Sequence, residues 1–238
     1  MTHLSGKERT KFVQRMFARI AQSYDMLNRI MTFGQDMKWR REAVQALAVH
    51  PGGRILDLGS GTGDILFEAL QTYPQSTVVG VDITPEMVQI GRRRKELDKA
   101  LWVIADVQNL PFAPSTFHGT ISAFLLRNLS EVSPILKEQL RVLSDGGKLV
   151  CLETTPAPKS PLSFITRLYL KRMIPILGSL IAQDMDAYTY LANSTTNFIP
   201  AEILVEKLTF VGFLEVNFTR RMFGMIAIHI AKKPDLYL

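Results

Sequence analysis

The sequence of residues 55–64 is Ile-Leu-Asp-Leu-Gly-Ser-Gly-Thr-Gly-Asp, a short apolar run followed by three glycines at alternate positions. The apolar run predicts a buried strand, and the glycines predict a tight turn that leads into a helix. Because glycine has no Cβ, it adopts unusual φ values and lets a ligand pack directly on the main chain. The stretch therefore predicts a strand, turn and helix whose turn holds a ligand.

The same alternation of apolar runs and helical patterns continues along the chain. Strands are predicted at residues 54–58, 77–82, 101–105, 119–124 and 147–153. Helical patterns lie between them at 63–72, 85–97 and 131–143, with a less regular one within 160–185. This order is typical of βαβ units and predicts an α/β fold with a doubly wound, mostly parallel sheet.

Two further strand-like runs close the chain, at residues 213–220 and 225–232. The turn between them, around Phe223 and Gly224, leaves no room for a crossover helix, so the two runs must pair antiparallel. A seven-stranded, mostly parallel sheet that ends in an antiparallel hairpin is the Rossmann-like pattern of class I methyltransferases that use S-adenosylmethionine (SAM). A classical dinucleotide-binding sheet stays parallel.

Composition predicts one domain over residues 1–238. The chain is 47% hydrophobic, and its 12 prolines and 15 glycines form no linker. Residues 1–50 are expected to form a helical cap over the carboxyl edge of the sheet, and residues 156–195 a helical insertion on the substrate side. The single cysteine, Cys151, excludes an intrachain disulfide and a cysteine zinc site, so no metal is expected.

The sequence also gives indications of location and partners. The N-terminus lacks the apolar core of a signal peptide, which favours the cytoplasm. The stretch 162–182 contains three cations and a proline, so it is not expected to span a membrane. The net charge of +6 favours anionic partners. Residues 162–177 fit either an element near lipid headgroups at the inner face of the membrane or a cap helix with solvated charges, and a homodimer also stays open.

Acidic residues follow three consecutive strands of the predicted sheet. The glycine spacing is G-x-G-x-G rather than the G-x-G-x-x-G that binds a pyrophosphate, and Asp57 and Asp64 suit the ammonium and sulfonium charges of SAM. Asp82 is expected to accept hydrogen bonds from ribose hydroxyls, and Asp106 from an adenine amino group. Together these residues predict a nucleoside site.

Several blocks of the chain resemble the signature segments of one enzyme family. They are residues 17–28 (Phe-Ala-Arg-Ile-Ala-Gln-Ser-Tyr-Asp-Met-Leu-Asn) with Phe33, Gly34 and Trp39, the loop 57–64, Leu-Pro-Phe at 110–112, Leu-Arg-Asn at 126–128, and residues 182–194. Over residues 17–232 the chain is similar to the ubiquinone/menaquinone biosynthesis C-methyltransferases. The resemblance implies SAM as cofactor and a prenylated quinol, of the demethylmenaquinol or 2-polyprenyl-benzoquinol type, as the lipid acceptor.

The motifs and the resemblance together give a set of expected cofactor-binding residues. They are Tyr24, Asp57, Gly59, Gly61, Thr62, Gly63, Asp82, Ile83, Asp106, Val107 and Ala123. Three positions depart from the family pattern: Ala123 replaces a frequent serine, Leu125 replaces a glycine, and residues 154–156 replace a Phe-Ser-Lys-Pro-like run. Leu125 is expected to narrow the space beside Arg127.

Four residues are candidates for catalysis. A quinol ring carbon becomes nucleophilic when the neighbouring hydroxyl loses its proton, so Arg127 is expected to stabilise the phenolate and Asn128 to orient the ring oxygen. Asp25 and Tyr188 are further candidates for acid/base or positioning roles, as are Tyr24 and Glu153. The alternative is that Arg127 pairs with a local carboxylate and Asn128 caps a helix near Ser130.

Other functions are less consistent with the sequence. A methyltransferase of a small soluble acceptor would share every feature except the substrate-side blocks. Nucleic-acid methylation is disfavoured because residues 124–128 lack an Asn/Asp-Pro-Pro-aromatic segment, and the basic run 92–95 fits a solvated helix face. A non-catalytic binding protein is disfavoured because the acidic and glycine positions of the cofactor edge are all in place.

Overall fold

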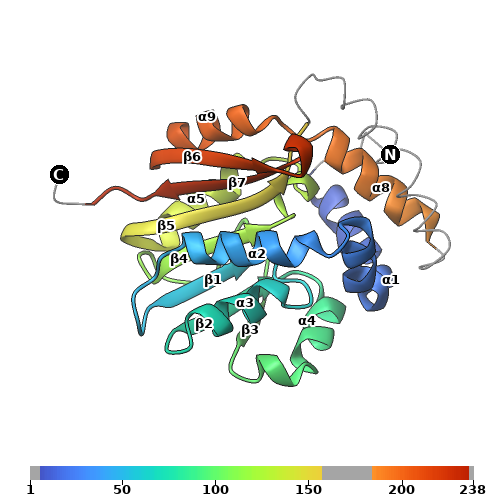
Figure 1. The fold of residues 1–238 in the computed structure, drawn as a ribbon, viewed down its shortest axis with the longest axis horizontal. Helices are drawn as coiled ribbons and strands as arrows, with labels where there is room; N and C mark the ends of the chain where they lie inside the picture. The colour runs from blue at the N-terminus through green and yellow to red at the C-terminus, as the bar shows by residue number, and fades with distance from the viewer. Residues whose placement is uncertain (1–5, 157–183, 236–238) are drawn as a thin grey trace.

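A computed structural model describes residues 6–156 and 184–235 of the chain. Its centre is a seven-stranded sheet in the order β3-β2-β1-β4-β5-β7-β6 (Figure 1). β1 to β5 pair parallel, whereas β7 lies antiparallel between β5 and β6. The predicted fold class is therefore confirmed, including the antiparallel hairpin at the C-terminal end.

The strands lie close to their predicted ranges. They are β1 (Arg54–Leu58), β2 (Thr77–Asp82), β3 (Leu101–Ile104), β4 (Phe117–Ala123), β5 (Leu143–Thr154), β6 (Leu214–Arg221) and β7 (Ile226–Lys232). The largest difference is at β5, which begins four residues earlier than the predicted 147, in a polar segment with two glycines that gave no strand pattern.

The helices differ more from the prediction. They are α1 (Gly6–Met31), α2 (Gln35–Ala46), α3 (Asp64–Thr72), α4 (Pro85–Arg92), α5 (Ser133–Val142), α8 (Met185–Thr196) and α9 (Ala201–Val211), with short 3-10 turns η1 (Lys95–Leu97), η2 (Leu126–Asn128) and η4 (Met222–Gly224). The predicted helix 85–97 is divided between α4 and η1. α9 was not predicted, and the expected helix within 160–185 lies almost wholly outside the described residues.

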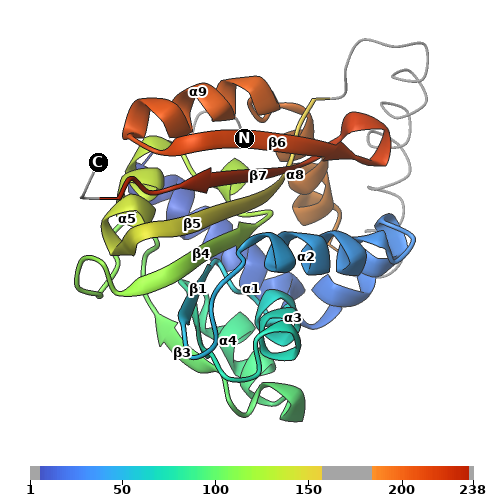
Figure 2. The same cartoon turned by 60° about the vertical axis from the view of Figure 1, so that its left-hand side comes forward.

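Two hydrophobic cores hold the layers together, one on each face of the sheet. α2 and α3 pack on one face around Val44, Leu66 and Ile121. α5 and α9 pack on the other around Leu136 and Leu208 (Figure 2). Because α2 covers a face of the sheet, the expected N-terminal cap over the carboxyl edge is limited to α1.

α1 lies across the carboxyl ends of the strands and is fixed there by polar contacts. Gln14 Nε2 donates to the Ile83 carbonyl at 2.8 Å, and Arg9 donates to the Arg127 carbonyl at 3.0 Å. Its apolar side packs against α8 through Met16, Ile20 and Leu191. In the described ranges no helix combines the length and apolar character needed to cross a membrane.

Candidate functional site

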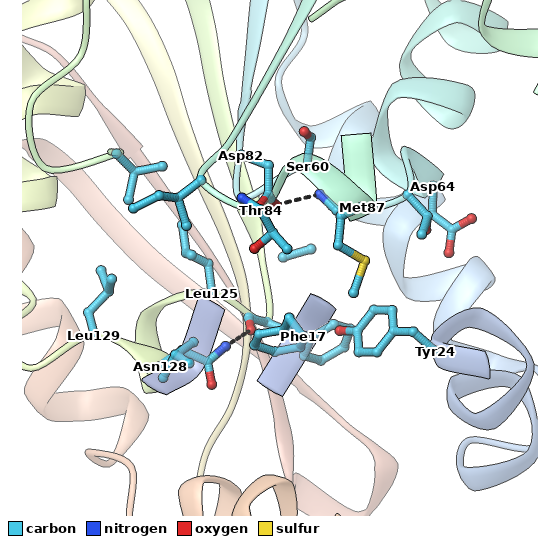
Figure 3. A pocket seen from close by; sticks show the side chains of 18 of the residues that line it. Phe17, Tyr24, Ser60, Asp64, Asp82, Thr84, Met87, Leu125, Asn128 and Leu129 are labelled. Carbon is cyan, nitrogen blue, oxygen red and sulfur yellow. Dashed lines mark hydrogen bonds between the residues drawn. The ribbon is translucent and has the colours of Figure 1, made fainter. Parts of the chain in front are cut away.

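A pocket lies between α1 and the carboxyl ends of β1, β2 and β4 (Figure 3). Most of the expected cofactor-binding residues line it: Tyr24, Gly59, Gly61, Thr62, Asp82, Ile83, Val107 and Ala123. The acceptor Asp82 lies at the end of a strand, and apolar side chains such as Phe17 and Met87 come from α1 and α4. This combination suits a nucleoside that carries an amino-acid chain.

The turn after β1 takes its shape from glycines in the left-handed region. Gly59 has a φ of 68° and Gly61 a φ of 55°, values that residues with a Cβ rarely adopt. Asp82 holds this turn, since its Oδ2 accepts from the Gly61 amide at 2.8 Å and its Oδ1 from the Thr84 amide at 2.8 Å. Gly63 is the N-cap of α3 and lies against Leu97 and Trp102 beneath the turn, outside the pocket lining.

Asp57 is a buried carboxylate directly behind the turn, outside the lining. It is 1% exposed, and neither of its oxygens has a hydrogen-bond partner among the described residues. Burial raises the pKa of Asp57 well above its usual value, and the charge of Arg40 opposes this shift. Arg40 itself is buried and lines the pocket. The loop thus carries an uncompensated acidic group close to a pocket-lining cation.

Asp64, by contrast, has arginine partners on both of its carboxylate oxygens. Arg29 donates to its Oδ2 at 2.7 Å and Arg94 to its Oδ1 at 3.0 Å, while Arg40 Nε lies 3.7 Å away. Burial alone would raise the pKa of Asp64, but these cations outweigh it and leave the pKa below its usual value. Asp64 lies at one end of the pocket (Figure 3), and its charge is already used to fix α1 and α2 to the cofactor loop.

Two other expected residues act within the protein rather than in the lining. Asp25 Oδ1 accepts from the Thr62 hydroxyl at 2.6 Å, which ties α1 to the glycine turn, and burial raises the pKa of Asp25. Asp106 lies beside the lining residue Val107, and its Oδ1 accepts from the Gln108 amide at 2.9 Å. In this arrangement the Asp106 carboxylate holds the turn after β3.

Leu125 occupies a different place from the expected one. A Cβ on Gly59 would lie only 2.7 Å from Leu125 Cδ1, so the leucine packs directly on the glycine turn. It lines the first pocket (Figure 3), while Arg127 lines a second pocket. The expectation that Leu125 narrows the space beside Arg127 is therefore wrong, because the main chain turns between the two residues and sends their side chains to different pockets.

We expect Leu125→Ala to weaken SAM binding about tenfold, because it removes an apolar wall of roughly 1–1.5 kcal/mol from the first pocket. Titration calorimetry on the purified variant measures this. Leu101→Ala is the matched control, since Leu101 is an exposed leucine on the edge strand β3. An unchanged affinity for SAM together with an altered KM for the acceptor would instead put Leu125 beside the acceptor.

The second pocket lies next to the first and shares Phe124 with it. Its apolar lining comes from Met31, Leu191, Met222, Met225 and Ile226, and its polar lining from Asn28, Thr32, Asp36, Arg127, Thr154 and Thr195. A ring with polar substituents and an apolar chain matches this lining. The spacing of these residues along the sequence gave no signal for the pocket, because they come from five separate segments.

Arg127 is held at the wall of the second pocket by a buried ion pair. Its Nη1 donates to Glu153 Oε1 at 3.1 Å, and its guanidinium lies 5.1 Å from the centre of the Phe124 ring. The Nε of Arg127 has no hydrogen-bond partner within the described ranges. Burial raises the pKa of Glu153, and the charge of Arg127 opposes this shift. The alternative in which Arg127 pairs with a carboxylate is thus observed.

Asn128 faces the first pocket instead. Its Nδ2 donates to the Phe124 carbonyl at 3.1 Å (Figure 3), and its Oδ1 has no partner in the part of the chain that the structure describes. Phe124 has a φ of 57°, an unfavourable backbone conformation for a phenylalanine, and its ring lies between Arg40 and Arg127. Tyr188 falls on α8, but its side chain lies outside the described part.

Several lining residues of the first pocket had no role assigned from the sequence. They are Thr10, Val13, Phe17, Arg40, Ser60, Thr84, Met87, Phe124 and Leu129. Phe17 lies in a block quoted for the resemblance, and Arg40 directly follows another quoted residue, Trp39. Ser60 belongs to the quoted loop 57–64. The others lie on α1 and α4 or directly beside strand and helix ends, and no pattern in the sequence singled them out.

Comparison with known proteins adds independent findings. The model of the ubiE/COQ5 methyltransferase family matches residues 3–233. A ubiquinone/menaquinone biosynthesis C-methyltransferase of Desulfotalea psychrophila is 41% identical, covering 91% of this chain and 88% of that protein. A demethylmenaquinone methyltransferase of Thermus thermophilus is 39% identical, covering 92% and 100%. The solved structure of a SAM-dependent methyltransferase from Thermotoga maritima has a TM-score of 0.64 at 19% identity, covering 93% and 99%, and shows the same fold.

Proposed function

The chain belongs to the ubiE/COQ5 methyltransferase family and is a SAM-dependent methyltransferase, and from this premise we propose that it methylates a ring carbon of a prenylated quinol. The acceptor would be of the demethylmenaquinol or 2-polyprenyl-benzoquinol type. The observation that carries the proposal is the second pocket, in which a buried arginine faces an apolar, methionine-rich wall beside the first pocket.

The chemistry of the first pocket fits SAM. The unpartnered Asp57 carboxylate favours a cation near the glycine turn, and Arg40 offers a charge for the amino-acid carboxylate. Gly59 and Gly61 allow the ligand to approach the main chain, and Asp82 is the acceptor available at the end of β2 for ribose hydroxyls. When bound, SAM supplies an electrophilic methyl carbon next to a sulfonium charge.

In the proposed complex, the second pocket holds the acceptor. The ring oxygens would face Arg127 and the threonines, and the prenyl chain would follow Met31, Met222 and Met225. Phe124 belongs to both pockets, so it would lie where donor and acceptor meet. The protein then aligns the two reactants and excludes water from them.

Arg127 would promote the reaction by stabilising a phenolate. A phenolic hydroxyl has a pKa of about 10, so a quinol is mostly neutral near pH 7 and its ring carbon is a weak nucleophile. A fixed guanidinium lowers the free energy of the phenolate, whose charge spreads onto the neighbouring ring carbon. Asn128 would orient the ring indirectly, because it donates to the carbonyl of Phe124, the residue shared by the two pockets.

An apolar tail keeps such an acceptor in a membrane, so we propose that the protein works at the inner face of the membrane. Its net charge of +6 favours anionic headgroups, which supports this location.

An acceptor series tests the proposed function. Purified protein is incubated with methyl-labelled SAM and with matched reduced acceptors: a prenylated naphthoquinol, a prenylated benzoquinol, the same rings without tails, and water-soluble phenols. We expect kcat/KM to be highest for a tailed quinol, because the second pocket offers an apolar path for the tail. A preference for soluble phenols would favour the small-acceptor alternative.

A further inference from the structure

Two exposed phenylalanines lie in similar turns on one side of the molecule. Phe33 in the turn between α1 and α2 is 77% exposed, and Phe223 in η4 is 74% exposed. Each precedes a glycine and has a positive φ, 52° for Phe33 and 53° for Phe223. Left-handed backbone is unfavourable for phenylalanine, and Asn or Gly would fit both positions better. The backbone conformation therefore does not favour a phenylalanine at either position.

Both turns border the second pocket. Thr32 and Met222, which line it, directly precede Phe33 and Phe223, and Met31 and Met225 continue the apolar lining behind them. The α1–α2 turn and η4, the turn between β6 and β7, lie on the same side of the molecule in both views (Figures 1 and 2). The apolar wall of the pocket thus continues to the surface at two phenylalanine side chains.

We propose that Phe33 and Phe223, here called the phenylalanine rim, form the surface with which the protein docks on a lipid bilayer. This inference rests on the proposed function in one respect: the apolar tail of the acceptor must pass from a bilayer into the second pocket. Large aromatic side chains gain free energy when they leave water for the interfacial region of a membrane. The net charge of +6 adds attraction to anionic headgroups.

Vesicle flotation tests the rim in the absence of any quinol. The probes are vesicles of phosphatidylcholine alone and of phosphatidylcholine with phosphatidylglycerol. The variant is Phe33→Asn with Phe223→Asn, because asparagine tolerates left-handed backbone and keeps the turns intact. Phe210→Gln is the matched control, since Phe210 on α9 is 88% exposed and does not line the second pocket. Calorimetry with SAM checks that each variant keeps its folded cofactor site.

We expect the full chain to float with anionic vesicles, and each rim substitution to weaken partitioning about tenfold. The Phe210→Gln control should float like the unmodified protein. Undiminished flotation of the double variant would overturn the proposal, as would a protein that binds neither type of vesicle. A third outcome would also overturn it: the protein forms a dimer in sedimentation velocity, the rim substitutions abolish that dimer, and no vesicle binding is seen. The rim would then be an interface with a second copy of the chain.

The rim and the proposed function can fail separately. On a quinol without a tail, the double variant should keep the kcat/KM of the unmodified protein, while its kcat/KM on a tailed quinol in vesicles falls with the partitioning. A protein that floats through the rim but methylates no quinol would refute the proposed function and leave the docking surface standing.

Discussion

Replacing both Arg127 and Glu153 by glutamine is expected to lower kcat about 100- to 1000-fold, the range found when one preorganised charge donor is removed from an anion site. Glu153 is changed together with Arg127 because the two form a buried ion pair at 3.1 Å. Removing the arginine alone would leave a buried carboxylate without its cation, at a cost of about 3–5 kcal/mol in the free energy of unfolding.

The single variant Glu153→Gln is the matched control, because it keeps the arginine and loses only the group that orients it. We expect a smaller loss for this control, and an unchanged Kd for SAM in both variants, since neither residue lines the first pocket. The pH profile gives a second readout. Without Arg127, kcat should keep rising toward pH 10, the usual pKa of a phenol. Equal rates for the control and the double variant would remove Arg127 from the reaction.

Asp57→Asn is expected to stabilise the protein without SAM by about 1–3 kcal/mol at pH 7, because burial penalises the negative charge of the unpartnered carboxylate and the amide carries no charge. The same change should weaken SAM binding about tenfold, because the positive charge of bound SAM favours the ionised carboxylate and an amide cannot supply that negative charge. Burial raises the pKa of Asp57 in the folded state, so the folded chain holds a proton that the unfolded chain releases above about pH 4. Stability is therefore lost as pH rises through this window, and the gain from the variant should grow over the same range.

Chemical denaturation between pH 4 and pH 8, with and without SAM, measures both effects. Asp64→Asn is the matched control from the same loop. The pKa of Asp64 is lowered by its arginine partners, so its contribution to stability is present above about pH 4 and is lost on acidification. We expect this control to destabilise the protein at pH 7. A loss of stability in Asp57→Asn would mean that Asp57 has a compensating partner in solution.

The contrast between Asp57 and Asp64 marks a limit of sequence reasoning. Both were expected to face cofactor cations, because both belong to the glycine loop. The arginines that neutralise Asp64 come from α1, α2 and the segment after α4, and no local pattern connects these segments to the loop. The order of the strands along the chain and the glycine turn could be predicted, because hydrophobic periodicity and backbone freedom are local properties of the sequence.

α9 and the second pocket were also not predicted, because they too depend on contacts between segments that are distant in the sequence. The sequence of α9, Ala-Glu-Ile-Leu-Val-Glu-Lys-Leu-Thr-Phe-Val, has a weak helical pattern, and only packing against α5 and β6 shows which face is buried. The second pocket is formed by residues from α1, α8, η4 and the strand ends. Arg127 could be singled out by resemblance and Glu153 was a further candidate, whereas their ion pair and the position of the Phe124 ring became evident only from the packing.

The measurement that tests the central claim most directly locates the transferred methyl group. Purified protein is given methyl-labelled SAM and a prenylated quinol, with reductant or with the oxidised quinone instead, and the lipid product is analysed by mass spectrometry and NMR. We expect the label on a ring carbon, and only when the acceptor is reduced. Label on an oxygen atom, or equal labelling of the quinone, would contradict the proposed phenolate chemistry at Arg127.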